Sequence, residues 1–120
     1  MSPPPAAPES PVYELRTYTA QPGKFDAIVA RFRDHTMKLF EKHGMRNVGY
    51  WMPTDAADGA GEKLIYLLRH PGREAAKAAW VAFKADPEWH AVVKTSEANG
   101  KLVLKIESVF LAATDYSQLK

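Results

Sequence analysis

Two hydrophobic periods follow one another along the chain, and their order limits the fold more than any other feature of the sequence. Apolar residues at every second position indicate strands, whereas apolar residues at every third or fourth position indicate helices. The patterns predict strand 12–19, helix 24–43, strands 46–52 and 62–69, a helical region over 73–98 and strand 101–111. This is the split β-α-β-β-α-β order of a ferredoxin-like α+β sandwich, in which both helical regions lie on one face of a four-stranded antiparallel sheet.

Turn-forming residues separate these segments. The Gln21-Pro22-Gly23 turn ends the first strand, and Gly44 follows the first helix where a left-handed cap is favoured. The loop at 53–61 is rich in glycine, proline and aspartate, so we expect a hairpin between the strands on either side of it. Asp86-Pro87-Glu88 predicts a restart of the second helical region, because aspartate caps a helix and proline is tolerated at its first position.

Composition excludes several classes of protein. A chain of 120 residues predicts a single domain, here at 12–120, after a disordered proline-rich leader at 1–11. The absence of cysteine excludes disulfides, thiolate nucleophiles and cysteine-bound metals. A net charge of +2 with acids and bases interleaved indicates no nucleic-acid binding. Because the chain has no long apolar run and no secretory signal, we expect no membrane insertion and a soluble, cytoplasmic protein.

The second face of the predicted sheet also needs a cover. The strand at 62–69 is apolar on both sides, with Leu64, Tyr66 and Leu68 alternating with Ile65 and Leu67. Face-to-face packing against another copy would bury the second side, so we predict a homodimer whose two sheets form a barrel. We expect Glu14 and Arg16 of the first strand, together with Lys105 and Glu107 of the last, to add charged pairs to that face.

Three segments resemble the NIPSNAP family: YELRTYTAQPGKFDAI from Tyr13, HGMRNVGYW from His43 and FKADPEW from Phe83. The resemblance extends from Val12 to about Leu111. It implies a dimeric α/β-barrel, of a superfamily that includes cofactor-poor monooxygenases, haem-degrading enzymes, small isomerases and members with no known chemistry. Animal members of the family, which are longer and have tandem domains, are associated with adaptor and trafficking roles.

His35 is the candidate catalytic residue. It falls on the apolar stripe of the first helix, where Ile28, Phe32, His35 and Leu39 follow one another at steps of four, three and four. An imidazole between helix and sheet could act as a general base or bind a ligand, because its pKa ordinarily lies near neutrality. The alternative is a buried imidazole that only hydrogen-bonds a strand tyrosine or a backbone carbonyl.

Aromatic and basic residues of the strands are candidates for substrate binding. Such a pocket would be mostly apolar, with a few placed polar groups. We assign this role to Tyr13, Arg16, Tyr50, Trp51 and Tyr66, with Arg69 as a second arginine able to hold an anion through its guanidinium fork. The alternative is that the aromatic residues form the core and the arginines form interface or surface ion pairs.

The predicted function follows from this set of residues and from the family resemblance. We expect the protein to bind a small apolar or aromatic molecule in a cleft between helix and sheet, with cofactor-free oxygenase-like chemistry as an extension. The alternative is a non-catalytic interaction or adaptor module. We predict no metal site, because no two of the four histidines have helical ligand spacing. The sequence identifies no cofactor and leaves open whether the protein is an enzyme.

Overall fold

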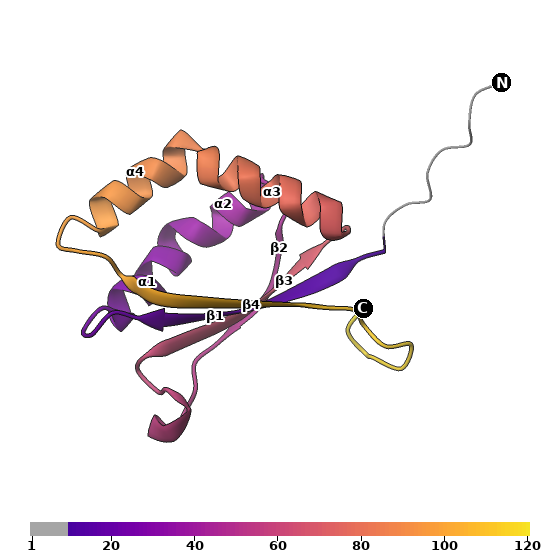
Figure 1. Cartoon of the computed structure of the whole chain (residues 1–120), viewed down its shortest axis with the longest axis horizontal. Coiled ribbons are helices and arrows are strands. Elements are labelled where there is room, and N and C mark those ends of the chain that lie inside the picture. The colour runs from indigo at the N-terminus through magenta and orange to yellow at the C-terminus, as the bar shows by residue number, and fades with distance from the viewer. Residues whose placement is uncertain (1–9) are drawn as a thin grey trace.

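The computed structural model describes residues 10–120, and Figure 1 shows their arrangement. The elements are β1 (Val12–Ala20), α1 (Phe25–Arg31), a π-helical turn η1 (Phe32–Thr36), α2 (Met37–Lys42), β2 (Arg46–Trp51), a short 3₁₀ turn η2 (Ala56–Asp58), β3 (Lys63–His70), α3 (Arg73–Ala85), α4 (Pro87–Ser96) and β4 (Val103–Leu111). The predicted leader at 1–11 falls mostly on residues 1–9, which lie outside the described residues.

The four strands form one antiparallel sheet in the order β2-β3-β1-β4. Helices α1 to α4 lie on one face of this sheet (Figure 1). The predicted hairpin is present, because β2 and β3 are neighbours and pair in opposite directions. Asp86 accepts a hydrogen bond from the Glu88 amide at 2.8 Å and so caps α4, where the sequence predicted a restart. The ferredoxin-like α+β fold is therefore confirmed.

The first helix contains a π-helical turn that the sequence did not predict. At η1 the Thr36 hydroxyl donates a hydrogen bond to the Arg31 carbonyl at 3.2 Å. The wider turn adds one residue to the helical repeat, so the buried face passes from Phe32 to Thr36 and on to Leu39. His35 is consequently exposed. The expected inward orientation of His35 is wrong, because that expectation assumed a regular α-helical repeat through this region.

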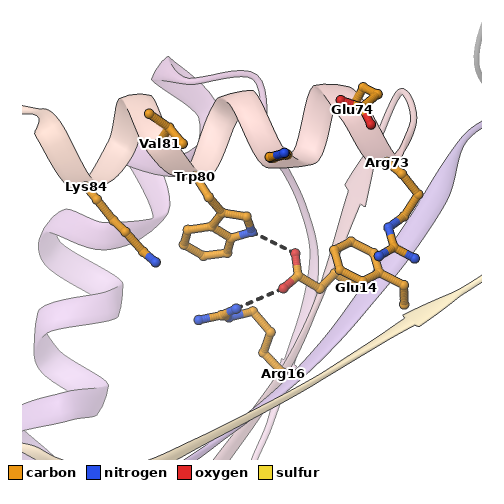
Figure 2. Close-up of a pocket in the computed structure, with 9 residues that line it drawn as sticks. Glu14, Arg16, Arg73, Glu74, Trp80, Val81 and Lys84 are labelled. Carbon is orange, nitrogen blue, oxygen red and sulfur yellow. Dashed lines mark hydrogen bonds and ion pairs between the residues drawn. The ribbon is translucent and has the colours of Figure 1, made fainter.

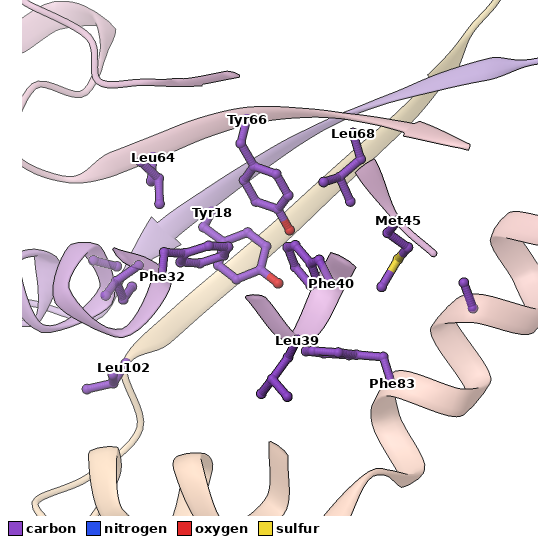
Figure 3. Packing of buried hydrophobic residues seen from close by; sticks show 13 residues of the cluster. Tyr18, Phe32, Leu39, Phe40, Met45, Leu64, Tyr66, Leu68, Phe83 and Leu102 are labelled. Carbon is purple, nitrogen blue, oxygen red and sulfur yellow. The ribbon is translucent and has the colours of Figure 1, made fainter. Parts of the chain in front are cut away.

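The hydrophobic core lies between the helices and the sheet, with Tyr66 at its centre (Figure 3). Its ring is fully buried and stacks on Tyr50, with ring centroids 5.1 Å apart. Phe32, Tyr18 and Phe40 surround it at centroid distances of 5.0, 5.5 and 5.9 Å. Stacked, edge and tilted contacts of this kind add to the stabilisation from area burial. The aromatic residues of β1, β2 and β3 thereby hold the first helix onto the sheet.

The helices cover the edge strand β4 only in part. Leu102, just before it, is buried, but Leu104 and Ile106 are 60% and 49% exposed. These side chains are exposed because β4 lies at the edge of the sheet. No helix within residues 10–120 is long and apolar enough to cross a membrane.

The other side of the sheet, here called the open face, is not covered by any of the helices α1 to α4 (Figure 1). At one end of it, the segment 112–119 after β4 forms a hollow with Tyr13 and Leu67. Tyr13 is only 5% exposed as a result. The remainder of the open face carries the side chains that alternate with the core residues, namely Leu15, Trp51, Ile65 and Val109.

Candidate functional site

A buried carboxylate at the start of β1 organises the polar part of the molecule. Oε1 of Glu14 accepts hydrogen bonds from His70 Nε2 and Trp80 Nε1, both at 2.8 Å. Oε2 accepts from Arg16 at 2.8 Å and from the Ser108 hydroxyl at 2.7 Å. The donors come from β1, β3, α3 and β4, so one side chain links three strands and a helix.

These four donors keep Glu14 ionised. Burial alone would raise the pKa of the carboxyl, but the hydrogen bonds from His70, Ser108, Trp80 and Arg16 lower it from 4.5 to about 2. At neutral pH the group is a carboxylate with each oxygen already accepting two hydrogen bonds. Glu14 therefore holds in position the four groups that hydrogen-bond to it, and it does not act as a proton donor.

The guanidinium of Arg16 is the cation that the Glu14 carboxylate holds in position. Its Nε donates to the Tyr66 hydroxyl at 2.7 Å, and a terminal nitrogen lies 3.4 Å from the Tyr18 hydroxyl. The guanidinium carbon lies 4.1 Å from the ring centroid of Trp80, in cation–π geometry. Burial by itself lowers the pKa of Arg16, but Tyr66, Tyr18 and Glu14 raise it above its ordinary value. Arg16 is thus a permanently charged group with a fixed orientation.

A cleft lies above these residues, between α3 and the β1–β4 side of the sheet (Figure 2). Figure 2 shows Trp80 and Lys84 extending from α3, and Glu14 joining Trp80 to Arg16. The cleft has a volume of about 500 Å³ and is called the α3 cleft below. It is lined by Glu14, Arg16, Arg73, Glu74, Lys77, Trp80, Val81, Lys84 and Phe110. This volume is in the range of sites for small organic molecules.

His70 supports the site from behind. Its side chain is fully buried and lies outside the lining of the α3 cleft. Because Nε2 donates to Glu14, the hydrogen of a neutral ring is on this nitrogen, and Nδ1 has no hydrogen-bond partner within residues 10–120. His70 therefore positions Glu14 and does not itself reach a ligand in the cleft.

The structure brings together three of the five predicted substrate-binding residues. Arg16 is bonded to Tyr66, and Tyr50 stacks on Tyr66. Tyr13 and Trp51 lie on the open face instead. For these two residues the expectation of one shared pocket is wrong. Their side chains point to the face of the sheet opposite to the one that carries Arg16, Tyr50 and Tyr66.

Two other expectations also need correction. Arg69 pairs with Tyr13 across β1 and β3, so it lies away from Arg16 and does not share a site with it. Glu14 and Arg16 do not face outward with Lys105 and Glu107, because both contact Trp80 of α3. They occupy the same face of β1 as the core residue Tyr18.

His35 lies in a different depression. A groove of about 500 Å³ runs between the first helix and α4, and His35, Arg31 and Glu88 are among its lining residues. The exposed His35 does not line the α3 cleft. Its catalytic role stays a prediction. No group of histidine and acidic residues within 10–120 is arranged to hold a metal ion.

Sequence reasoning missed Glu14, His70 and Ser108 as members of one site. The available signal was the alternation of side chains along β1, since Glu14 and Arg16 point to the same face as the apolar residues Tyr18 and Ala20, which the structure buries. Two charged residues on a core face indicate a buried polar cluster, because isolated charges are too costly to bury.

The fold and this cluster define a ferredoxin-like α+β domain with a charged cleft between its helices and its sheet. The NIPSNAP family model matches residues 13–118, and the chain belongs to the NIPSNAP family. The family resemblance drawn from the sequence is therefore confirmed. Among curated proteins, none matches the chain.

Solved structures of bacterial NIPSNAP proteins have the same fold. A NIPSNAP family protein of unknown function from Agrobacterium tumefaciens is 19% identical with a TM-score of 0.77, over 93% of this chain and 96% of that one. A second from the same organism is 17% identical with a TM-score of 0.77, over 92% and 99%. An uncharacterized NIPSNAP domain protein from Burkholderia xenovorans is 20% identical with a TM-score of 0.72, over 88% and 97%. At these identities the similarity shows the fold alone.

Proposed function

We propose that this NIPSNAP protein binds a small organic molecule in the α3 cleft and works as a homodimer joined through its open faces. One observation carries the binding proposal: the cleft of about 500 Å³ has at its base a partly buried, oriented arginine, which Glu14 and Trp80 hold in place. Fixing a buried charge in this way is costly unless the charge is paired. In natural ligand sites, polar groups held in place in this way fix the orientation of the ligand.

The cleft supports binding more directly than catalysis. Glu14 is ionised and its oxygens are occupied, and the pKa of Arg16 is raised, so neither group is ready to transfer a proton near neutrality. The oxygenase-like chemistry implied by the family resemblance would need a reactive substrate, with the protein supplying position and electrostatics. The adaptor alternative stays a prediction, since no feature of residues 10–120 favours it over ligand binding.

The binding proposal is tested by mapping fragments onto the protein. A library of small aromatic fragments is titrated into ¹⁵N-labelled protein, and backbone amide shifts are followed. We expect the shifts to cluster at 73–84 and 108–110, which border the α3 cleft. The variant Val81→Trp should abolish them, because Val81 lines the cleft and is 65% exposed, so a larger side chain obstructs the cleft without disturbing the core. Ala98→Trp, at an exposed position outside the cleft, is the matched control. Shifts confined to the groove beside His35 would contradict the proposal.

The dimer proposal is supported by apolar side chains on the open face. Val109 and Leu111 of β4 are 54% and 42% exposed, and Trp51 of β2 is 53% exposed on the same side. Leu15 and Leu67 pair across β1 and β3 between them. A second copy of the same face would remove this apolar surface from water.

A matched pair of variants tests the dimer. Val109→Lys places a charge on the open face, whereas Val81→Lys places one on the exposed side of α3. By light scattering at micromolar concentration, we expect the wild type and Val81→Lys to be dimers and Val109→Lys to be a monomer. A monomeric wild type would overturn the proposed assembly.

A further inference from the structure

We infer that the ligand of the α3 cleft is an organic carboxylate, whose head group binds Arg16 and Lys84 and whose apolar body lies against Val81 and Phe110. This inference rests on the proposed function and gives the ligand a chemical class. Two observations support the inference. Some hydrogen-bond donors of the cleft have no partner among its internal contacts, and the residues that line the cleft have a net positive charge.

Arg16 has hydrogen-bond donors that its contacts within the protein do not use. A guanidinium carries five N–H groups, and within residues 10–120 those of Arg16 make three hydrogen bonds, to Glu14, Tyr66 and Tyr18. Two N–H groups therefore remain, on the terminal nitrogens of a side chain that is 12% exposed and lines the cleft. The planar fork of arginine matches the two oxygens of a carboxylate. The three internal bonds hold the fork in position before a ligand arrives, which lowers the entropic cost of binding.

Lysines of α3 reinforce the positive potential. Lys77 and Lys84 line the cleft, and neither ammonium group forms an ion pair within residues 10–120. Figure 2 shows the Lys84 side chain directed from α3 toward the side of the cleft where Arg16 lies. Together with Arg16 and Arg73, these lysines exceed the two acidic lining residues by two positive charges. A cleft of this sign attracts anions and disfavours cations.

The chemistry of Glu14 strengthens this assignment. A ligand cation or amide donor entering the cleft would need an acceptor, and the obvious one is the Glu14 carboxylate. That carboxylate already accepts from four donors, so a further donor would have to displace Trp80, His70, Ser108 or Arg16. The cleft thus offers free donors at its base while its buried acceptor is saturated.

The remaining lining can hold an apolar body. Val81 is largely exposed on α3. The guanidinium carbon of Arg73 lies over the Phe110 ring, 3.9 Å from the ring centroid. A carboxylate attached to a ring or short alkyl body would place the charge at Arg16 and the body along Val81 and Phe110. Removing that body and these side chains from water adds to the affinity without adding specificity.

A matched pair of probes tests the inference. 2-Naphthoate and 2-naphthamide have similar shapes, but only the first has a charged head. By calorimetry at low salt, with binding mapped by amide shifts, we expect 2-naphthoate to bind in the α3 cleft at least about tenfold more tightly, the effect of a charge-assisted hydrogen bond of about 1.4 kcal/mol. The advantage should shrink as ionic strength rises. Lys84→Gln should lower the affinity for 2-naphthoate severalfold, whereas Lys94→Gln, on α4 outside the cleft, should not.

Each outcome is informative. Equal binding of 2-naphthamide and 2-naphthoate at the cleft would refute the carboxylate assignment and leave small-molecule binding intact. Failure of both probes to shift the cleft amides at millimolar concentration would overturn the binding proposal together with this inference. An unchanged affinity in Lys84→Gln would refute the role of Lys84 in holding the head group.

Discussion

Replacement of Glu14 by glutamine is the perturbation that most directly tests the buried cluster. The two side chains have nearly the same shape, but glutamine has one acceptor oxygen and brings an amide that is itself a donor. Of the four groups that now donate to Glu14, two would face that amide and lose their acceptor. Each buried donor left unpaired costs about 1–3 kcal/mol.

The pKa of Glu14 gives a second value for the unfolding free energy that Glu14→Gln should lose. In the unfolded chain the carboxyl titrates near 4.5, and in the folded protein near 2. At about 1.4 kcal/mol per pKa unit, the ionised carboxylate stabilises the fold by about 3 kcal/mol at neutral pH. Because the folded pKa is the lower one, this stabilisation is fully present above about pH 4.5 and is lost as the pH falls toward 2. The two unpaired donors give a loss of about 2–6 kcal/mol and the pKa gives about 3 kcal/mol, so we predict a loss of about 3 kcal/mol for Glu14→Gln.

The assay is urea unfolding of the wild type and Glu14→Gln at pH 7 and at a series of lower pH values. We expect the difference in unfolding free energy to be about 3 kcal/mol at pH 7 and to shrink below pH 4.5. Glu107→Gln is the matched control, because Glu107 lies on β4 with its side chain 51% exposed. If Glu14→Gln fails to fold, NMR titration of the Glu14 carboxyl in the wild type still measures its pKa. A loss below 1 kcal/mol with no pH dependence, or a carboxyl pKa near 4.5, would refute the reasoning.

Three further substitutions test the local structure. Gly44→Ala should cost about 1 kcal/mol in chemical unfolding, because Gly44 has a φ of 82°, and an unchanged stability would contradict that conformation. Asp86→Ala should lower the melting temperature and speed amide exchange in α4, since Asp86 caps that helix and accepts from Lys42 and His43; unaltered exchange would contradict the cap. His35→Gln should change the unfolding free energy by less than about 0.5 kcal/mol, as expected at an exposed position, and a larger loss would contradict that exposure. Loss of ligand binding or turnover in His35→Gln would establish its predicted functional role.

Most of the fold could be predicted because it depends on local periodicity. The strands at 46–52 and 62–69 alternate within themselves and are separated by a loop with clear turn residues, so their pairing required no distant information. The start of α4 was equally local, since Asp86 caps a helix whose first residue is Pro87. Such features are determined within a few residues of the chain.

The first helix shows where local periodicity fails. One additional residue in the turn at η1 rotates everything that follows it, and a regular repeat of apolar residues does not reveal where such a turn occurs. Between Phe32 and Leu39, either His35 or Thr36 could continue the buried face of the helix. Both residues are polar, so hydrophobicity alone does not indicate which one is buried. Thr36 is the buried one, because its hydroxyl satisfies the Arg31 carbonyl within the π-helical turn.

The candidate site could not be assembled from the sequence because its contacts are distant. Glu14 meets residues 56, 66 and 94 positions away, in His70, Trp80 and Ser108. These pairings depend on the register of β1 against β3 and β4, which the hydrophobic pattern determines only where one face is consistently apolar. In β1 the charged Glu14 and Arg16 point to the helix-covered face, whereas the sequence analysis placed them with Lys105 and Glu107 on the opposite face of the sheet.

The most direct test of ligand binding in the α3 cleft is a crystal structure of the protein with 2-naphthoate. We expect its carboxylate within hydrogen-bond distance of Arg16, with Lys84 nearby and the ring system against Val81 and Phe110. The internal contacts of Glu14 should be unchanged. A naphthoate bound in the groove beside His35, or bound in the α3 cleft with its carboxylate turned away from Arg16 toward solvent, would contradict the account.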